Sequence, residues 1–218
     1  MRLAEPVDGP AVTALAAVAA ARRIAIVAGF VETNPAAADR PFNTAIVIGS
    51  DGRVVGAYRK THLFEREAGA FSAGDGYPVF DVHVGAGERR LRVGACICYD
   101  VEFPEVPRLL ALGGAELIAV PSADMEPYRA QQAANLMSRA IENNLHVALA
   151  NTVDVRSNVT FFGGSGIAAP DGRLVSAGYG RPRLVVASLT AAAVEASGGA
   201  GSSLRSRRVE TFGGLLAR

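Results

Sequence analysis

The chain has 218 residues, 50% of them hydrophobic, and its 22 basic and 21 acidic residues leave a formal net charge of +1. This length and composition can bury a full core, so we expect a single domain spanning residues 1–218. The near-neutral charge excludes the strong field typical of proteins that bind nucleic acid or anionic membranes, and it favours a small-molecule partner.

The cysteines, Cys96 and Cys98, are separated by a single residue. This spacing is poor for a structural disulfide, so we predict free thiols and a cytoplasmic protein. His62, His83 and His146 lack the paired spacing of zinc sites, so no metal is expected. The first residues lack the basic and apolar parts of a signal peptide, and no apolar run is long enough to span a bilayer. We therefore expect neither secretion nor a membrane partner.

The expected elements alternate between helices and strands. A helix begins at Gly9-Pro10 because the apolar residues after it recur at helical spacing. Asp51-Gly52 predicts a hairpin, since this pair supports the positive φ of a tight turn. In chain order we expect a helix over 10–22, strands over 24–31, 43–48, 53–58 and 91–97, a helix over 104–112, a strand over 117–120, a helix over 130–143, and strands over 146–150, 163–168, 173–176 and 183–189. This order predicts an α/β fold with mixed sheets.

An apolar strand that ends abruptly at Cys98 is the most informative part of the sequence, because strands deliver nucleophiles to active-site rims in this way. A thiol attacks only as the thiolate, so it needs a base or a nearby positive charge. Lys60, just beyond the strand 53–58, can supply that charge, and with the backbone N–H of Tyr99 it would bind an oxyanion. Taken singly, Cys98 fits a buried apolar residue better, and Lys60 fits a solvated strand-end charge.

Several motifs in order resemble the nitrilase superfamily of carbon-nitrogen hydrolases, whose members use a Glu, Lys and Cys triad. The matching motifs are Tyr58-Arg59-Lys60, Cys98-Tyr99-Asp100 with Phe103-Pro104-Glu105, and Arg139-Ala140-Ile141-Glu142-Asn143 with Ala150-Asn151. They cover nearly the whole chain. Within the superfamily, the run from Lys60 to Gly74, Gly114-Ala115-Glu116-Leu117, Val120-Pro121 and Met125-Glu126-Pro127-Tyr128 are most similar to 5-aminopentanamidases and stereoselective amidases.

The resemblance implies that Cys98 is the nucleophile, that Lys60 is the oxyanion-stabilising cation, and that Glu67 is a second glutamate that positions the lysine and the substrate. An exposed loop carboxylate is an equally good interpretation of Glu67. The residues that the resemblance places near the substrate pocket are Tyr99, Met125, Glu126, Tyr128 and Asn151, although Tyr128 fits packing equally well. Arg139 and Glu142 lie three apart on a helix, which favours a structural ion pair.

The resemblance also implies a four-layer αββα sandwich, no cofactor, and a homodimer or higher homo-oligomer that uses helices near the cysteine and the C-terminal tail over 198–218. The implied reaction is the hydrolysis of a small linear carboxamide to a carboxylate and ammonia through a cysteine thioester. A nitrilase or an N-carbamoyl amidohydrolase on the same scaffold, and a catalytically silent binding module, are the alternatives.

The sequence departs from the family pattern at its start. In relatives, the triad glutamate follows the first strand in a Pro-Glu turn, ahead of the helix that here begins near Pro10. The segment from Ala4 to Pro10 resembles the entry into that helix, so we expect the first strand and helix to be missing, and Glu5 not to be catalytic. Glu32 is the best internal substitute, but a structural role fits it better. We expect impaired activity, and a start codon assigned too late explains the gap more simply than an evolved pseudoenzyme.

Overall fold

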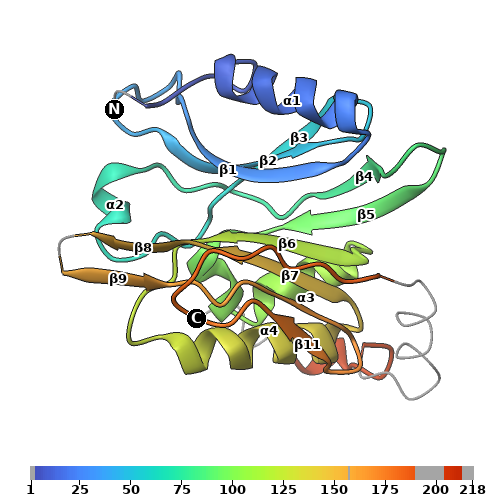
Figure 1. Ribbon diagram of the computed structural model, residues 1–218. Coiled ribbons are helices and arrows are strands. Elements are labelled where there is room, and N and C mark those ends of the chain that lie inside the picture. Colours follow the sequence, from blue (N-terminus) through green and yellow to red (C-terminus); the bar gives the residue numbers. More distant parts are fainter. Residues whose placement is uncertain (1–2, 157, 190–203, 213–218) are drawn as a thin grey trace.

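Two β-sheets lie face to face in the structure, a computed structural model that describes residues 3–156, 158–189 and 204–212. Helix α1 (Pro10–Arg22) covers the outer face of one sheet. Helices α3 (Glu105–Leu112) and α4 (Arg129–Asn143) cover the outer face of the other (Figure 1). The layers therefore follow the order helix, sheet, sheet, helix, and the predicted αββα sandwich is confirmed.

The first sheet has three antiparallel strands in the order β1-β2-β3. Their bounds are Ile26–Glu32, Phe42–Ile48 and Val54–Arg59. Successive side chains of a strand point to opposite faces. In the central strand β2, Ile46 and Ile48 pack with residues of α1, whereas Val47 packs with the second sheet. Burial on both faces explains why β2 is a nearly continuous apolar run.

The turn between β2 and β3 is the hairpin predicted at Asp51-Gly52. Gly52 has a φ of 80°, in the left-handed region that glycine adopts without strain. A Cβ atom at this position would also lie 2.7 Å from the carbonyl oxygen of Ala16 in α1. Glycine therefore closes the turn and lets α1 pack closely over it.

The second sheet has six strands in the order β11-β10-β7-β6-β5-β4. From β4 to β7 the bounds are Val79–His83, Arg90–Ala95, Leu117–Ser122 and His146–Asn151, and β10 and β11 span Gly166–Ala168 and Leu174–Ser176. Strands β5, β6 and β7 are parallel, so each connection crosses over the sheet through a helix. Their carboxyl ends consequently lie at one edge, which is where α/β proteins form ligand sites.

The smaller elements lie at the ends of these strands. Helix α2 (Glu67–Ala70) follows β3, and the 3₁₀ helix η1 (Cys98–Glu102) follows β5. The hairpin β8–β9 (Val153–Arg156 and Val159–Phe162) follows β7, and η2 (Val209–Thr211) is the last described element. The predicted partner contact of the tail over 198–218 falls mostly on residues outside the described ranges.

Parts of the predicted secondary structure are wrong. Residues 183–189 form no strand, and Leu184 and Val186 are 89% and 74% exposed, because no described strand pairs with this segment and an apolar pattern cannot form a ladder alone. The strand expected over 163–168 shortens to β10, because Gly163 and Gly164 have positive φ values. The edge strand β4 and the short hairpin β8–β9 were not predicted.

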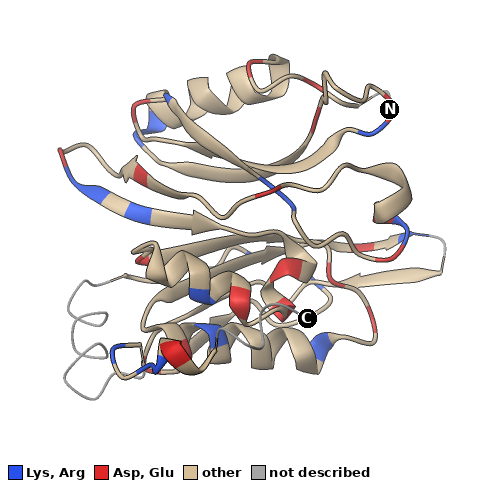
Figure 2. Cartoon of the chain, turned by 180° about the vertical axis from the view of Figure 1, so that it is seen from behind, with Lys and Arg blue, Asp and Glu red and all other residues tan. Residues whose placement is uncertain are grey.

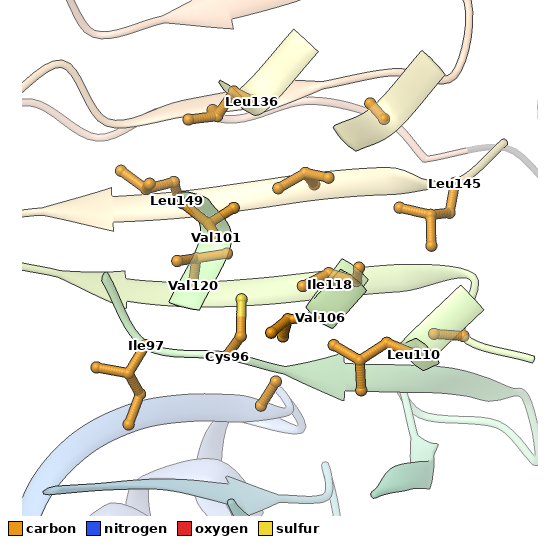
Figure 3. Packing of buried hydrophobic residues seen from close by; sticks show 14 of the residues in the cluster. Cys96, Ile97, Val101, Val106, Leu110, Ile118, Val120, Leu136, Leu145 and Leu149 are labelled. Carbon is orange, nitrogen blue, oxygen red and sulfur yellow. The ribbon is translucent and has the colours of Figure 1, made fainter. Parts of the chain in front are cut away.

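The largest hydrophobic cluster lies between the second sheet and helices α3 and α4. Cys96 belongs to it, and Figure 3 shows its sulfur directed toward Val101 and Val120. Burying one Val, Leu or Ile side chain of this cluster contributes roughly 1.5–3 kcal/mol to the free energy of folding. This cluster holds the base of the turn that carries Cys98.

Basic and acidic residues are interspersed over both sheets and the helices that cover them (Figure 2), in keeping with the net charge of +1. Within the described ranges, no helix combines the length and the apolar character that crossing a membrane requires. The cytoplasmic location expected from the reduced thiols stays a prediction.

Candidate active site

The turn after β5 presents Cys98 to a cavity of about 350 Å³. Cys98 has a φ of 48°, which is uncommon for a residue other than glycine and costs of order 1–3 kcal/mol. Such strain persists where the surrounding structure imposes it. Lys60 and Glu67 line the same cavity, and Phe64, Met125 and Phe161 supply apolar walls.

Lys60 is held at the end of β3 and is only 2% exposed. Its backbone N–H donates to the carbonyl of Asn43 at 2.8 Å, which continues the pairing with β2. Its Nζ donates to Oε2 of Glu67 at 2.6 Å. A buried ammonium is costly unless it is paired, so Glu67 stabilises the charge where it faces the cavity.

Glu67 is fixed by further hydrogen bonds. Its Oε2 accepts the backbone N–H of Phe64 at 2.8 Å, and its Oε1 accepts Nδ2 of Asn43 at 3.1 Å. These contacts place its carboxylate beside the lysine and exclude the interpretation of Glu67 as an unattached loop residue.

Asp100 is a fully buried carboxylate in η1. Its Oδ2 accepts the hydroxyl of Tyr58 at 2.8 Å and the backbone N–H of Ile97 at 3.0 Å. Its Oδ1 accepts the hydroxyl of Thr61 at 3.1 Å and the backbone N–H of His62 at 2.9 Å. Charge-assisted hydrogen bonds of this kind are the stronger ones in proteins.

These bonds join the segment around Lys60 to the turn around Cys98. Tyr58, Thr61 and His62 donate from the segment 58–62, and Ile97 donates from the turn that carries Cys98. The buried carboxylate of Asp100 therefore fixes the position of Cys98 relative to Lys60. The ring of His62 adds to the connection, since it stacks on Phe103 with centroids 3.8 Å apart.

Arg139 of α4 holds the other end of the turn. Its Nε donates to the carbonyl of Val101 at 2.9 Å, and its Nη2 donates to the carbonyl of Glu102 at 2.8 Å. Its Nη1 pairs with Glu142 at 3.1 Å, as the sequence predicted. The guanidinium thus satisfies carbonyl groups that the short 3₁₀ helix leaves without partners.

Asp124 contacts the thiol and was not predicted. Its Oδ1 lies 3.1 Å from Sγ of Cys98, with the thiol as donor. Asp124 follows β6 as Cys98 follows β5, and the two strands are parallel neighbours. The signal that identified Cys98, a reactive side chain just after an apolar strand, also applies to Asp124.

Asn151, at the end of β7, holds the backbone of Asp124. Its Oδ1 accepts the N–H of Asp124 at 2.7 Å, and its Nδ2 donates to the carbonyl of Asp124 at 3.1 Å. The same Nδ2 lies 3.1 Å from Oε1 of Gln132, a buried residue of α4. Asn151 therefore lies behind Asp124 and does not line the cavity.

The thiols have different electrostatic surroundings. Burial raises the pKa of Cys98 to about 11, and the negative charge of Asp124 raises it as well, whereas the ammonium of Lys60 acts in the opposite direction. Burial in the core raises the pKa of Cys96 well above its usual range. Both thiols are therefore protonated at neutral pH.

The remaining predicted pocket residues divide into two groups. Tyr99, Met125 and Tyr128 line a small extension of the site beside Cys98. The ring of Tyr99 contacts Phe64 edge-on with centroids 5.1 Å apart. Glu126 lines neither space, because its carboxylate pairs with Arg129.

Glu32 has the structural surroundings expected for it. It is 3% exposed, its carboxylate pairs with the guanidinium of Arg59 at 2.5 Å, and it accepts the hydroxyl of Thr44 at 2.8 Å. Within the described ranges, no group of three or more His, Cys, Asp or Glu side chains is arranged to hold a metal ion.

Fold and site together define an αββα sandwich protein with a thiol, a buried ammonium and carboxylates around one cavity. Residues 1–197 match the family model for carbon-nitrogen hydrolases, so the chain belongs to that family. The resemblance to the nitrilase superfamily is thereby confirmed.

Named relatives agree with this assignment. A hydrolase encoded in the pqqF 5' region of Pseudomonas protegens is 36% identical over 99% of this chain and 74% of its own length. An (R)-stereoselective amidase of Pseudomonas sp is 36% identical over 85% of this chain, which spans 65% of that amidase. This chain therefore spans less than two thirds of the amidase.

A solved structure supports the same family assignment. A mutant of the amidase from Nesterenkonia sp. AN1, with acrylamide joined to its active-site cysteine by Michael addition, is 31% identical and has a TM-score of 0.76. The comparison covers 93% of this chain and 73% of that one.

Proposed function

We propose that the protein is an amidase that hydrolyses a small linear carboxamide to a carboxylate and ammonia through a thioester on Cys98. The observation that carries the proposal is the shared cavity of about 350 Å³, which Cys98 and the Lys60–Glu67 ion pair line together. The similarity to an amidase with a reactive active-site cysteine supports it.

The first half-reaction forms the thioester. The sulfur of Cys98 attacks the amide carbon, and the carbonyl oxygen becomes an oxyanion that Lys60 and the backbone N–H of Tyr99 stabilise. Collapse of this intermediate breaks the C–N bond, and the proton that the thiol gives up passes to the nitrogen, so that ammonia leaves. Water then hydrolyses the thioester and restores the thiol, so a difficult reaction is divided into two easier ones.

Glu67 acts through Lys60 in this proposal. It accepts the Nζ hydrogen bond at 2.6 Å and is itself fixed by Phe64 and Asn43. A cation held in place before the substrate arrives stabilises the developing charge without reorganisation.

The sequence predicts impaired activity because no glutamate occupies the triad position, and this stays a prediction. In this structure the Glu32 carboxylate is committed to Arg59 and Thr44, which supports a structural role and argues against substitution for a triad base. The rate of ammonia release by the 218-residue chain is the direct measurement.

We also propose a homodimer. Leu109 and Leu112 of α3 and Ile141 of α4 are about half exposed, at 47%, 49% and 50%, on helices that pack against each other. Leu109 and Leu112 lie three positions apart and therefore on one face of α3, and exposed apolar groups on one face are typical of a protein interface. Sedimentation should show that the wild-type protein is a dimer and that the double variant Leu109→Lys/Leu112→Lys is a monomer. The control variant Val155→Lys, which changes an exposed residue of the β8–β9 hairpin, should remain a dimer.

The activity is tested by incubating the purified chain with linear carboxamides, nitriles and N-carbamoyl compounds. We expect ammonia from carboxamides and an acyl adduct on Cys98 by mass spectrometry. Ammonia only from nitriles indicates a nitrilase, and ammonia with carbon dioxide indicates an N-carbamoyl amidohydrolase. Absence of both product and adduct would identify a silent module and refute the proposal.

A further inference from the structure

We propose that Phe161 determines how long an acyl chain the active-site cavity accepts, and that the substrate carboxamide carries an aliphatic chain that lies against this ring. The inference rests on the proposed amidase function. It extends that function from the reacting amide group to the other end of the substrate.

Apolar side chains line the cavity without belonging to the core. Phe64, Met125 and Phe161 supply its apolar walls. None of the three is a member of the hydrophobic clusters that the described residues form. Apolar groups that stay outside the core and line a concave site are available to bind the apolar part of a ligand.

Phe161 reaches the cavity from the β8–β9 hairpin, which belongs to neither main sheet. The hairpin lies at the same end of the molecule as α2, the helix that begins at Glu67 (Figure 1). Phe161 pairs with Met125 in an antiparallel bridge. The N–H of Glu126 donates to the carbonyl of Thr160 at 2.9 Å, which fixes the same contact. Residues paired across such a bridge point to the same side, so both side chains meet the cavity.

The neighbouring Phe162 anchors the hairpin from its other face. Phe162 is 1% exposed, and its ring contacts Tyr179 edge-on with centroids 5.8 Å apart. Successive residues of a strand point to opposite faces, so Phe161 faces away from this contact and lines the cavity. Phe161 therefore has a fixed direction although it is not packed in the core.

The position of the reacting group directs the acyl chain toward these walls. The substrate must place its amide carbon at the sulfur of Cys98, so its chain extends into the rest of the cavity. The extension beside Cys98 has a volume of only about 20 Å³, close to the space that one water molecule needs, so it leaves no room for a chain. Contact with Phe161 then depends on the length of the chain.

The energy of this contact gives a measurable selectivity. Each methylene group that the chain adds against an apolar wall should raise kcat/KM about fourfold, from the free energy of burying one CH₂ group. A chain that is too long must displace the ring, which overpacks the site and reverses the gain. The wild-type protein should therefore show its highest kcat/KM at one chain length and lower values on both sides.

The test measures two rates over the linear series from propanamide to octanamide: kcat/KM for ammonia release, and formation of the acyl adduct on Cys98 by mass spectrometry. Phe161→Ala enlarges the cavity and should move the maximum to longer chains, whereas Phe161→Trp should move it to shorter ones. The ratio of octanamide to propanamide should rise about tenfold or more in Phe161→Ala and fall by a similar factor in Phe161→Trp, since one methylene of misfit is worth about 10- to 200-fold.

Val155→Ala is the matched control in the same hairpin. Val155 is 68% exposed and pairs with Thr160, so it points to the face opposite Phe161. Its ratio of octanamide to propanamide should equal that of the wild type. Both rates in a ratio come from one sample, so a partly unfolded variant lowers them equally, and circular dichroism identifies any loss of fold.

An unchanged chain-length profile in correctly folded Phe161→Ala and Phe161→Trp would overturn this inference and leave the amidase proposal standing. Shifts in the same direction in both variants would also overturn it, because they would not follow the size of the side chain. Wild-type protein that neither releases ammonia from any carboxamide nor forms an acyl adduct on Cys98 would overturn both proposals.

Discussion

Cys96 and Cys98 are two residues apart, yet they occupy different chemical environments. Cys96 is fully buried in the cluster between the second sheet and its helices (Figure 3), whereas Cys98 lines a cavity and contacts Asp124. In a continuous strand, residues i and i+2 face the same side, so both sulfurs would enter the core. The positive φ of Cys98 ends the strand geometry and turns its side chain toward the cavity.

The comparison shows that a local backbone conformation separates the thiol packed in the core from the thiol that lines the cavity, since the residue type is the same. The strained turn is retained because Asp100 and Arg139 hold it on its two sides. Changes to either cysteine, to the lysine or to these supports should therefore have effects of clearly different size.

The largest expected effect on activity comes from replacing each cysteine in turn. Cys98→Ser should lower ammonia release to background, a loss that reaches about a millionfold when a covalent nucleophile is removed. Cys96→Ala should keep the activity and only weaken the fold, because it leaves a small cavity in the core. Equal losses of activity in correctly folded variants would contradict the distinction.

The next effect is at Lys60. Lys60→Met should reduce kcat by about 100- to 1000-fold, the usual cost of one oxyanion donor, with little change of KM. The variant leaves Glu67 without its cation, so Lys60→Met/Glu67→Gln is the matched control. Steady-state kinetics in which only KM rises would indicate that Lys60 binds substrate in its ground state.

Asp100 tests the support of the turn. Asp100→Asn should lower the free energy of unfolding by about 1–3 kcal/mol, because the new amide cannot accept all the buried donors. It should also slow acylation of Cys98 by misplacing it relative to Lys60. Urea unfolding and acylation rates check this, with Asp171→Asn, an exposed site, as the control.

The smallest effect is the pH dependence of stability. Burial and Asp124 raise the pKa of Cys98 from an ordinary value of 9.0 to about 11. The neutral thiol therefore stabilises the fold fully below pH 9, and this contribution is lost as the pH rises toward 11. Cys98→Ala should lose less stability than wild type over that interval in urea titrations, and an identical decline would contradict the raised pKa.

Much of this molecule follows from short-range patterns. Helical spacing after Pro10 and the Asp51-Gly52 pair predict elements that the structure contains, because their signals lie within a few neighbouring residues. Cys98 and Lys60 were identified as strand-end residues by the same local logic. The segment 183–189 was assigned wrongly because a strand depends on a partner that its own residues do not specify.

The contact between Cys98 and Asp124 joins residues 26 positions apart and exists only because β5 and β6 pair in parallel. The ion pairs of Glu32 with Arg59 and of Lys60 with Glu67 likewise join residues of different elements, so they form only when the chain packs. The sequence by itself determined the family, the main elements and the thiol with its lysine. The tertiary structure decided which carboxylate meets which group, because side-chain contacts across strands depend on sheet order and on the turns that end each strand.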